Sequence, residues 1–429
     1  MKRISVVFAI MLLAVLFIAG CAMSGYEGDY SGYPRDPAPG SSTGDGMGSG
    51  SGEGGSGQVE IPAGQLTAGE WCDLENPEFW KALIGYDASQ AEDNQISEAT
   101  NQFRQLDKNS TSLLPVKVTS DGKPVFNARV EVFNSGENQE VLSRAFTDVL
   151  GRAYLFPGEG YEFTVKASIA SPDNSDVMIT SSVVVARDEV DFYKTVEIEL
   201  EGVINTPVSS QLMLVVDTTG SMSDELEYIE AEIKDVIKRV DANNPNGKTE
   251  VALLFYRDAG DQYVTKYYDF TTDMNAVYEN ISLQMASGGG DIPEAVDIAF
   301  EKAMAAQWRF AATKLIMHVA DAPHHFDNAE ANERYFKAIE SAREQGIRIV
   351  TVASSGIDLT TELLMRQHCM LTGGTYVFLT NHSGIGNDHL EPTVGAYTIE
   401  YLNDCLVRVA MEYLLGIEIE PVPYDQQQQ

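Results

Sequence analysis

The sequence has few basic residues for its length. Lysine and arginine together number 29 against 64 aspartates and glutamates, which gives a formal net charge of −35. A surface of this kind repels the phosphates of nucleic acids and anionic lipid headgroups, and it attracts cations. The charge balance therefore excludes nucleic acid as a partner.

Cysteine is also scarce, with four residues in the chain. Three of them, Cys72, Cys369 and Cys405, match no zinc-binding spacing. In an exported protein a disulfide is permitted, and Cys369 with Cys405 is the first pair to test. The alternative interpretation is that all three are small buried apolar side chains.

Long apolar runs are lacking except at the N-terminus. Residues 1–20 combine a short positive region, an apolar stretch and a small-residue end, which is typical of a secretory signal peptide. The sequence from Ile18 to Cys21, IAGC, resembles a bacterial lipobox, in which Cys21 is lipidated and becomes the new N-terminus. A plain transmembrane anchor is the alternative. We expect a lipid-anchored protein of the bacterial cell envelope, and Ala22 favours the outer membrane or cell surface.

Composition divides the remaining chain into segments. Residues 21–60 are dominated by Gly, Ser, Asp and Pro, which predicts a lipidated anchor followed by a flexible tether. Residues 61–112 contain aromatic side chains that we expect to pack on a neighbouring domain, followed by a linker. In residues 113–203, alternating runs such as ARVEVF predict about seven strands of a small β-sandwich. Residues 204–418 form the main domain, and residues 419–429 are expected to be a flexible tail.

The segment from residue 204 onward alternates strands with helices. Apolar runs such as QLMLVVD, KLIMHVAD and IRIVTVAS are continuous, which is typical of parallel strands covered on both faces. They predict an α/β fold with a doubly wound, mostly parallel sheet, in which ligands bind beyond the carboxyl ends of the strands. Asp217 and Asp321 each end such a run. Asp224 and Glu225 suit the positive N-terminus of the helix that follows the first strand.

Oxygen-bearing side chains follow three of the predicted strands and helices. The turn DTTGS offers one carboxylate and two hydroxyls, the loop SGGGDIPEA another carboxylate, and the loop ADAPHH a third. Ser287 is an alternative ligand from the second loop. Oxygen ligands from separate loops suit a hard divalent cation, first Mg²⁺, with Mn²⁺ and Ca²⁺ as alternatives. The predicted metal ligands are Asp217, Thr219, Ser221, Asp291 and Asp321.

These residues resemble the metal-ion-dependent adhesion site of von Willebrand factor type A domains, whose pattern is Asp-x-Ser-x-Ser, a threonine and an aspartate. Asp217 and Ser221 match directly, Thr219 keeps a hydroxyl, and Asp321 falls where the last aspartate is expected. Segments such as LLFYRDAGDQYVTKYYDFT and GGGDIPEAVDIAF resemble the extracellular, hemicentin-like branch of that family, over residues 208–415. The stretch DGKPVFNARVEVF resembles carboxypeptidase-regulatory-like domains.

The resemblance implies a non-enzymatic protein that recognises a protein partner, whose carboxylate completes the coordination of the metal. The second loop departs from the family pattern, because Asp291 stands where most members have threonine. A third carboxylate tightens cation binding but lowers the residual positive charge on the ion. Attraction for an acidic partner is then expected to weaken.

Two other function classes remain open. A metal-dependent hydrolase of phosphate or ester bonds would use two metal ions, and His324 and His325 lie beside Asp321. We interpret these histidines as solvated loop residues, because adjacent side chains point in different directions. Ser221 lacks the GxSxG elbow of a nucleophile. The remaining class is a structural envelope protein with a degenerate site that binds no ion.

Overall fold

The structure is a computed structural model, and it describes residues 61–85, 94–134, 140–171, 175–187, 192–245, 247, 249–290 and 292–427. The predicted signal peptide, the lipidation site Cys21, the tether and Asp291 lie outside the described residues. None of the helices in the described part of the chain combines the length and apolar character that a membrane crossing requires.

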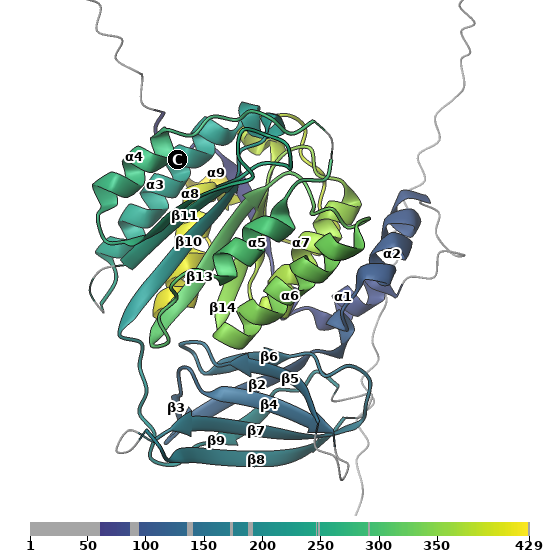
Figure 1. Ribbon diagram of the computed structural model, residues 1–429, viewed down its shortest axis with the longest axis vertical. Coiled ribbons are helices and arrows are strands. Elements are labelled where there is room, and N and C mark those ends of the chain that lie inside the picture. Colours follow the sequence, from purple (N-terminus) through teal and green to yellow (C-terminus); the bar gives the residue numbers. More distant parts are fainter. Residues whose placement is uncertain are drawn as a thin grey trace, which may run out of the picture. The chain divides into compact units, whose positions relative to one another are not determined.

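An eight-stranded sheet forms the centre of the α/β domain (Figure 1). Its strand order is β12-β11-β10-β13-β14-β15-β1-β16, and the strands from β11 to β15 in this order are parallel. The mostly parallel α/β sheet predicted from the sequence is therefore confirmed. The strands are β10 (Ser209–Asp217), β11 (Thr249–Tyr256), β12 (Thr265–Thr271), β13 (Ala312–Ala320), β14 (Ile347–Ala353), β15 (Tyr376–Leu379), β1 (Thr67–Trp71) and β16 (Glu400–Tyr401).

Helices cover both faces of this sheet, as Figure 1 shows. Leu212 and Leu214 of β10 join one buried cluster with α3, α4 and α8, whereas Met213 and Val215 join another with α5, α6 and α7. The strand reads as a continuous apolar run because neither of its faces meets water. The helices are α3 (Leu226–Ala242), α4 (Met274–Ser282), α8 (Leu402–Ala410), α5 (Val296–Met304), α6 (Ala329–Gln345) and α7 (Leu359–Thr372).

The segment predicted as an aromatic region and linker contributes to the same domain. Strand β1 pairs antiparallel with β15 and β16. It is followed by α1 (Pro77–Ile84) and α2 (Asn94–Leu106), where the buried Trp80 packs edge-on against Phe103. The Glu232 carboxylate of α3 accepts hydrogen bonds from the backbone N–H groups of Gly64, Gln65 and Leu66 at 2.7, 2.7 and 3.0 Å. These contacts fix the start of the described chain to the domain.

Residues 114–199, called the β-rich region below, form two four-stranded sheets around one buried cluster. In β2 the residues alternate between buried and more exposed positions, and Val116 and Val118 face the cluster. This alternation is the pattern of a half-buried strand. The strands are β2 (Leu114–Ser120), β3 (Lys123–Pro124), β4 (Arg129–Asn134), β5 (Val141–Phe146), β6 (Arg152–Leu155), β7 (Glu162–Ala170), β8 (Met178–Ala186) and β9 (Val196–Glu199).

Residues near the C-terminus contact strand β16. Residues 419–429, expected to be a flexible tail, contain a helical turn in which Tyr424 donates to the Ile399 carbonyl at 2.7 Å and packs on the Tyr401 ring. The remaining elements are η2 (Ser110–Ser112), η3 (Gly220–Asp224), η4 (Asn381–Ser383), the π-helix η5 (Met411–Leu415) and α9 (Tyr424–Gln427).

The three cysteines within the described residues are free. Cys369 and Cys405 belong to different buried clusters, so the disulfide considered from the sequence is not formed. Cys369 donates to the Thr351 hydroxyl at 3.3 Å, and burial raises the pKa of its thiol to about 12. Cys369 and Cys405 are small buried side chains, as the alternative interpretation expected.

Candidate metal centre

Asp217 and Asp321 lie at neighbouring positions on the same edge of the sheet. Asp217 is the last residue of β10, and Asp321 directly follows β13. The two strands are adjacent and parallel, with Val216 opposite Val319, so both carboxylates leave the sheet at its carboxyl end. Both are buried, and burial together with the negative charge of Asp321 raises the pKa of Asp217.

The DTTGS turn brings two hydroxyls to Asp217. The backbone N–H and the hydroxyl of Thr219 both donate to Asp217 Oδ1, at 2.8 and 2.6 Å, and Ser221 Oγ lies 3.2 Å from Thr219 Oγ1. Burial raises the pKa of Asp321, and the neighbouring Ser221 hydroxyl lowers it by a smaller amount. Four of the five predicted ligands, Asp217, Thr219, Ser221 and Asp321, are thus brought together.

The second loop is tied to this turn through backbone groups. Arg257 donates to the carbonyls of Thr218 and Met285 at 3.1 and 2.7 Å. The Ser287 N–H donates to the same Thr218 carbonyl at 3.0 Å, whereas the residue itself is exposed. Ser287 therefore contributes backbone contact to the site rather than a buried hydroxyl.

Glycines allow this close approach. A Cβ on Gly220 would lie 2.9 Å from the Gly288 carbonyl oxygen, and Gly289 has a φ of +71°, in the left-handed region that favours glycine. Asp261 Oδ2 accepts the Gly289 N–H at 2.8 Å. Gly288 and Gly289 therefore pack closely against neighbouring loops, whereas a Cβ on Gly290 would meet nothing within 4 Å.

Glu294 is a site residue that the sequence interpretation missed. Its side chain is buried, with the residue 3% exposed. A Cβ added to Gly289 would lie 2.8 Å from Glu294 Oε1 and 3.3 Å from the Thr219 Cβ, so Glu294 and Thr219 both lie next to this glycine. Its N–H donates to the Pro323 carbonyl at 2.9 Å, which links the second loop to the third. Burial, and then the charge of Asp217, raises the pKa of Glu294 to about 9.

Pro293 favours a helix that begins directly after it, which would place Glu294 in the first turn. In the structure α5 begins at Val296, and Glu294 pairs instead with His324 in an isolated bridge. The sequence carries no local signal for this role, because the burial of Glu294 and its bond to Pro323 are visible only in the structure.

Three carboxylates of the site have an oxygen without a hydrogen-bond partner. Among the described residues, Asp217 Oδ2, Glu294 Oε2 and Asp321 Oδ1 are buried and unpaired. Buried carboxylates normally receive hydrogen bonds, a positive side chain or a metal ion. Together with two hydroxyls, this set offers oxygen ligands only, which fits a hard divalent cation.

The two histidines of the third loop do not fit the sequence interpretation equally. His324 is 1% exposed and stacks on Tyr335 with ring centres 3.7 Å apart, so the interpretation of a solvated residue is wrong. Its Nε2 lies 2.7 Å from Asn332 Oδ1, and burial lowers its pKa to about 4. His325 is partly exposed, with its Nε2 2.8 Å from Asp258 Oδ1. Both rings thus have partners other than the three unpaired carboxylates.

Asp224 and Glu225 lie at the N-terminus of α3, as expected from the sequence, and they also connect loops. Glu225 stands at the N-cap position without a side-chain cap; its carboxylate accepts the Ser355 N–H at 3.2 Å and lies 2.8 Å from His389 Nε2. Asp224 Oδ2 accepts the Asn387 N–H at 2.7 Å. These contacts fasten two further loops to the turn that carries Ser221.

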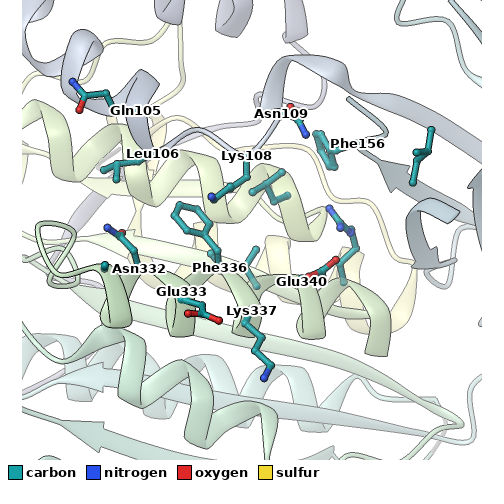
Figure 2. Close-up of a pocket in the computed structure, with 15 residues that line it drawn as sticks. Gln105, Leu106, Lys108, Asn109, Phe156, Asn332, Glu333, Phe336, Lys337 and Glu340 are labelled. Carbon is teal, nitrogen blue, oxygen red and sulfur yellow. The ribbon is translucent and has the colours of Figure 1, made fainter. Parts of the chain in front are cut away.

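A second acidic cluster and a surface hollow lie outside this candidate metal centre. Glu70, Glu400 and Cys405 lie close enough to hold an ion, but Arg408 already pairs with both carboxylates. A hollow of about 840 Å³, shown in Figure 2, is lined by residues of α2, α6 and the β-rich region. It mixes apolar and charged side chains, with the Lys108 ammonium 5.1 Å from the centre of the Phe336 ring. None of its lining residues is a predicted metal ligand.

A family model described as "von Willebrand factor A domain" matches residues 211–367 of this chain. The matched residues include Asp217, Glu294 and Asp321. Residues 211–367 form a von Willebrand factor A (VWA) domain. VWA domains are interaction modules, generally without enzymatic activity, and they typically bind a divalent metal ion. The family expected from the sequence is confirmed for this part of the chain.

Two curated relatives match parts of the VWA-containing chain. An ariadne-like RING finger protein of Acanthamoeba polyphaga mimivirus is 30% identical over 122 residues, or 28% of this chain and 12% of that protein. The alpha-protein kinase vwkA of Dictyostelium discoideum is 28% identical over 117 residues, or 27% of this chain and 18% of that protein. The chain thus spans less than a fifth of either relative.

A solved structure is also similar. The conserved hypothetical protein BatB from Bacteroides thetaiotaomicron is 13% identical, and the similarity covers 42% of this chain and 92% of that chain with a TM-score of 0.31.

Proposed function

We propose that this chain is an exported, lipid-anchored binding protein of the bacterial cell envelope, whose VWA domain recognises a protein partner with the help of a divalent cation. The proposed ion is Mg²⁺. Glu294 takes the place in the ligand set that the sequence interpretation gave to Asp291. The proposed ligands are Asp217, Thr219, Ser221, Glu294 and Asp321.

One observation carries the metal proposal. Unpaired oxygens of Asp217, Glu294 and Asp321 are buried beside the hydroxyls of Thr219 and Ser221. Without a cation, these three carboxylates either share negative charge in one water-poor site or take up protons, and both are costly near neutral pH. A divalent ion would balance two of these charges and fix the positions of three loops.

The metal proposal is tested by titrating Mg²⁺ into the wild-type chain, Asp217→Ala and Glu294→Gln, with melting temperature and calorimetric heat as readouts. Bound Mg²⁺ stabilises the folded chain by about 2.7 kcal/mol when its concentration is one hundred times the Kd. We expect a Mg²⁺-dependent rise in melting temperature for the wild type, a smaller rise for Glu294→Gln and none for Asp217→Ala.

Glu279→Gln serves as the control, because Glu279 is an exposed residue of α4. It should respond to Mg²⁺ as the wild type does. Equal melting curves for wild type and Asp217→Ala at all Mg²⁺ concentrations would contradict the metal proposal.

The export proposal is supported by the apolar residues 1–20 and by the IAGC sequence that ends at Cys21. Growth with radioactive palmitate should label the wild-type protein and place it in the membrane fraction. Cys21→Ser should lose the label. A Cys21→Ser protein that is still labelled would rule out lipidation at this position.

A further inference from the structure

The loops around the proposed metal site carry an excess of negative charge. They comprise residues 217–225, 257–261, 285–294 and 321–325, which contain no lysine and one arginine, Arg257. That guanidinium is buried and already donates to two backbone carbonyls. The described acidic residues of these loops are Asp217, Asp224, Glu225, Asp258, Asp261, Glu294 and Asp321.

The proposed ligand set leaves the bound ion without net positive charge. Asp217, Glu294 and Asp321 each have a buried oxygen that no hydrogen bond satisfies, so each faces the site as an anion once a cation is bound. Three carboxylates exceed the charge of one divalent ion. A fourth carboxylate from a partner would therefore be repelled, since like charges interact strongly where water is excluded.

Large apolar side chains stand exposed on the second loop. Met285 is 75% exposed and Ile292 is 70% exposed, one on each side of the glycine run that packs against the DTTGS turn. The Met285 backbone is held by Arg257, and Ile292 lies two residues before the buried Glu294. Exposed apolar side chains beside a charged site are typical of protein interaction surfaces.

We propose that the partner presents a lysine or arginine flanked by apolar side chains to this face, and not a metal-binding carboxylate. The inference rests on the proposed function and specifies its partner. Apolar side chains of the partner would contact Met285 and Ile292, and its basic group would pair with the partly exposed carboxylate of Asp261. The cation then holds the loops in position instead of joining the two proteins.

The test uses the full-length chain in Mg²⁺ and a phage-displayed library of random peptides as the probe. We expect the captured peptides to be enriched in lysine or arginine next to leucine, isoleucine or phenylalanine, and depleted in aspartate and glutamate. Enrichment of acidic peptides, the absence of a charge preference, or no capture at all would each overturn the inference.

Three variants test whether the peptides are captured on this face. The double variant Met285→Ser with Ile292→Ser should lose capture several-fold, whereas Val184→Ser, at an exposed position of β8, should not. Glu294→Thr, which removes one carboxylate, should shift the selected peptides towards acidic residues. Unchanged capture by the double variant would overturn the inference.

Mg²⁺ binding is measured by calorimetry on the same protein. If Mg²⁺ binds and acidic peptides are captured, the partner inference alone is wrong and the metal proposal stands. If no Mg²⁺ binds, both are wrong.

Discussion

At the scale of single residues, the candidate site is defined by buried carboxylates and by glycines that let loops approach them. Glu294 is the most informative of these residues, because burial and neighbouring negative charge raise its pKa to about 9. An aspartate or glutamate in an unfolded chain titrates near pH 4. The folded, metal-free chain therefore holds protons that the unfolded chain releases.

This difference predicts how stability depends on pH. The stabilising effect of a raised carboxyl pKa is fully present below the unfolded value and is lost as pH rises through the folded value. In EDTA, we expect the melting temperature to fall between pH 6 and pH 9. Saturating Mg²⁺ should reduce this fall, because the ion replaces the protons. The measurement is a series of melting curves across that range with and without Mg²⁺, and a Glu294→Gln variant should show a smaller fall in EDTA.

Gly289 provides a second prediction at this scale. An alanine there would place its Cβ 2.8 Å from Glu294 Oε1 at a φ of +71°. Gly202→Ala is the matched control, since Gly202 has a φ of +70° but nothing within 4 Å of a Cβ. Both substitutions should lower the free energy of unfolding by roughly 1–2 kcal/mol through backbone strain. We expect only Gly289→Ala to weaken Mg²⁺ binding; equal Mg²⁺ affinity in the two variants would mean that the loop contact is unimportant.

At the scale of elements, the buried strands were predictable and the edges of the fold were not. Strands β10 and β13 read as unbroken apolar runs that end in Asp217 and Asp321, so the sequence predicts their type, their order and their common edge. Strand β1, with the sequence TAGEW, is short and has no clear alternation. Its place in the sheet depends on partners more than 300 positions away, β15 and β16.

The candidate site could likewise be predicted only in part. A side chain that ends an apolar run, such as Asp217, can be identified from the sequence. Glu294 reaches the site because its backbone bonds the Pro323 carbonyl before α5 begins, and that is a tertiary contact. Local preference favours a helix start after Pro293, so it points away from this role.

The attachment of residues 64–66 to α3 gives a prediction at the element scale. Glu232 is buried and accepts three backbone hydrogen bonds, so Glu232→Ala leaves these donors without a partner. We expect the free energy of unfolding to fall by at least about 2 kcal/mol, as measured in urea. Glu227→Ala, at an exposed position of the same helix, should change it little. We expect the backbone amides of β1 to exchange faster in Glu232→Ala than in the wild type. Equal exchange rates in the two proteins would contradict the proposed attachment of β1 through Glu232.

At the scale of the whole molecule, the VWA domain depends on chain that precedes the β-rich region. Leu66 and Ala68 lie in the cluster with α3 and α8, and Trp80 lies in the cluster with α6 and α7. A chain limited to residues 204–418 would expose the surfaces that these side chains cover. Each buried large apolar side chain contributes about 1.5–3 kcal/mol.

We therefore expect residues 204–418 alone to melt at a lower temperature and to aggregate more readily than residues 61–427. Light scattering and thermal melting of the two purified chains measure both effects. The truncation should remain destabilised in Mg²⁺ if the missing strand is the cause. Equal melting temperatures would show that β1, α1 and α2 are dispensable for the domain.

The connection between Glu232 and residues 64–66 also bears on mechanical load. Helix α3 begins directly after the turn that carries Thr219 and Ser221. Glu232 of the same helix accepts the hydrogen bonds of residues 64–66. Tension applied between the N-terminal side and a bound partner would thus pass through α3 and the hydrogen bonds of β1. The β-rich region, inserted between α2 and β10, lies outside this force path, and its strands would bear no strain until β1 is pulled free.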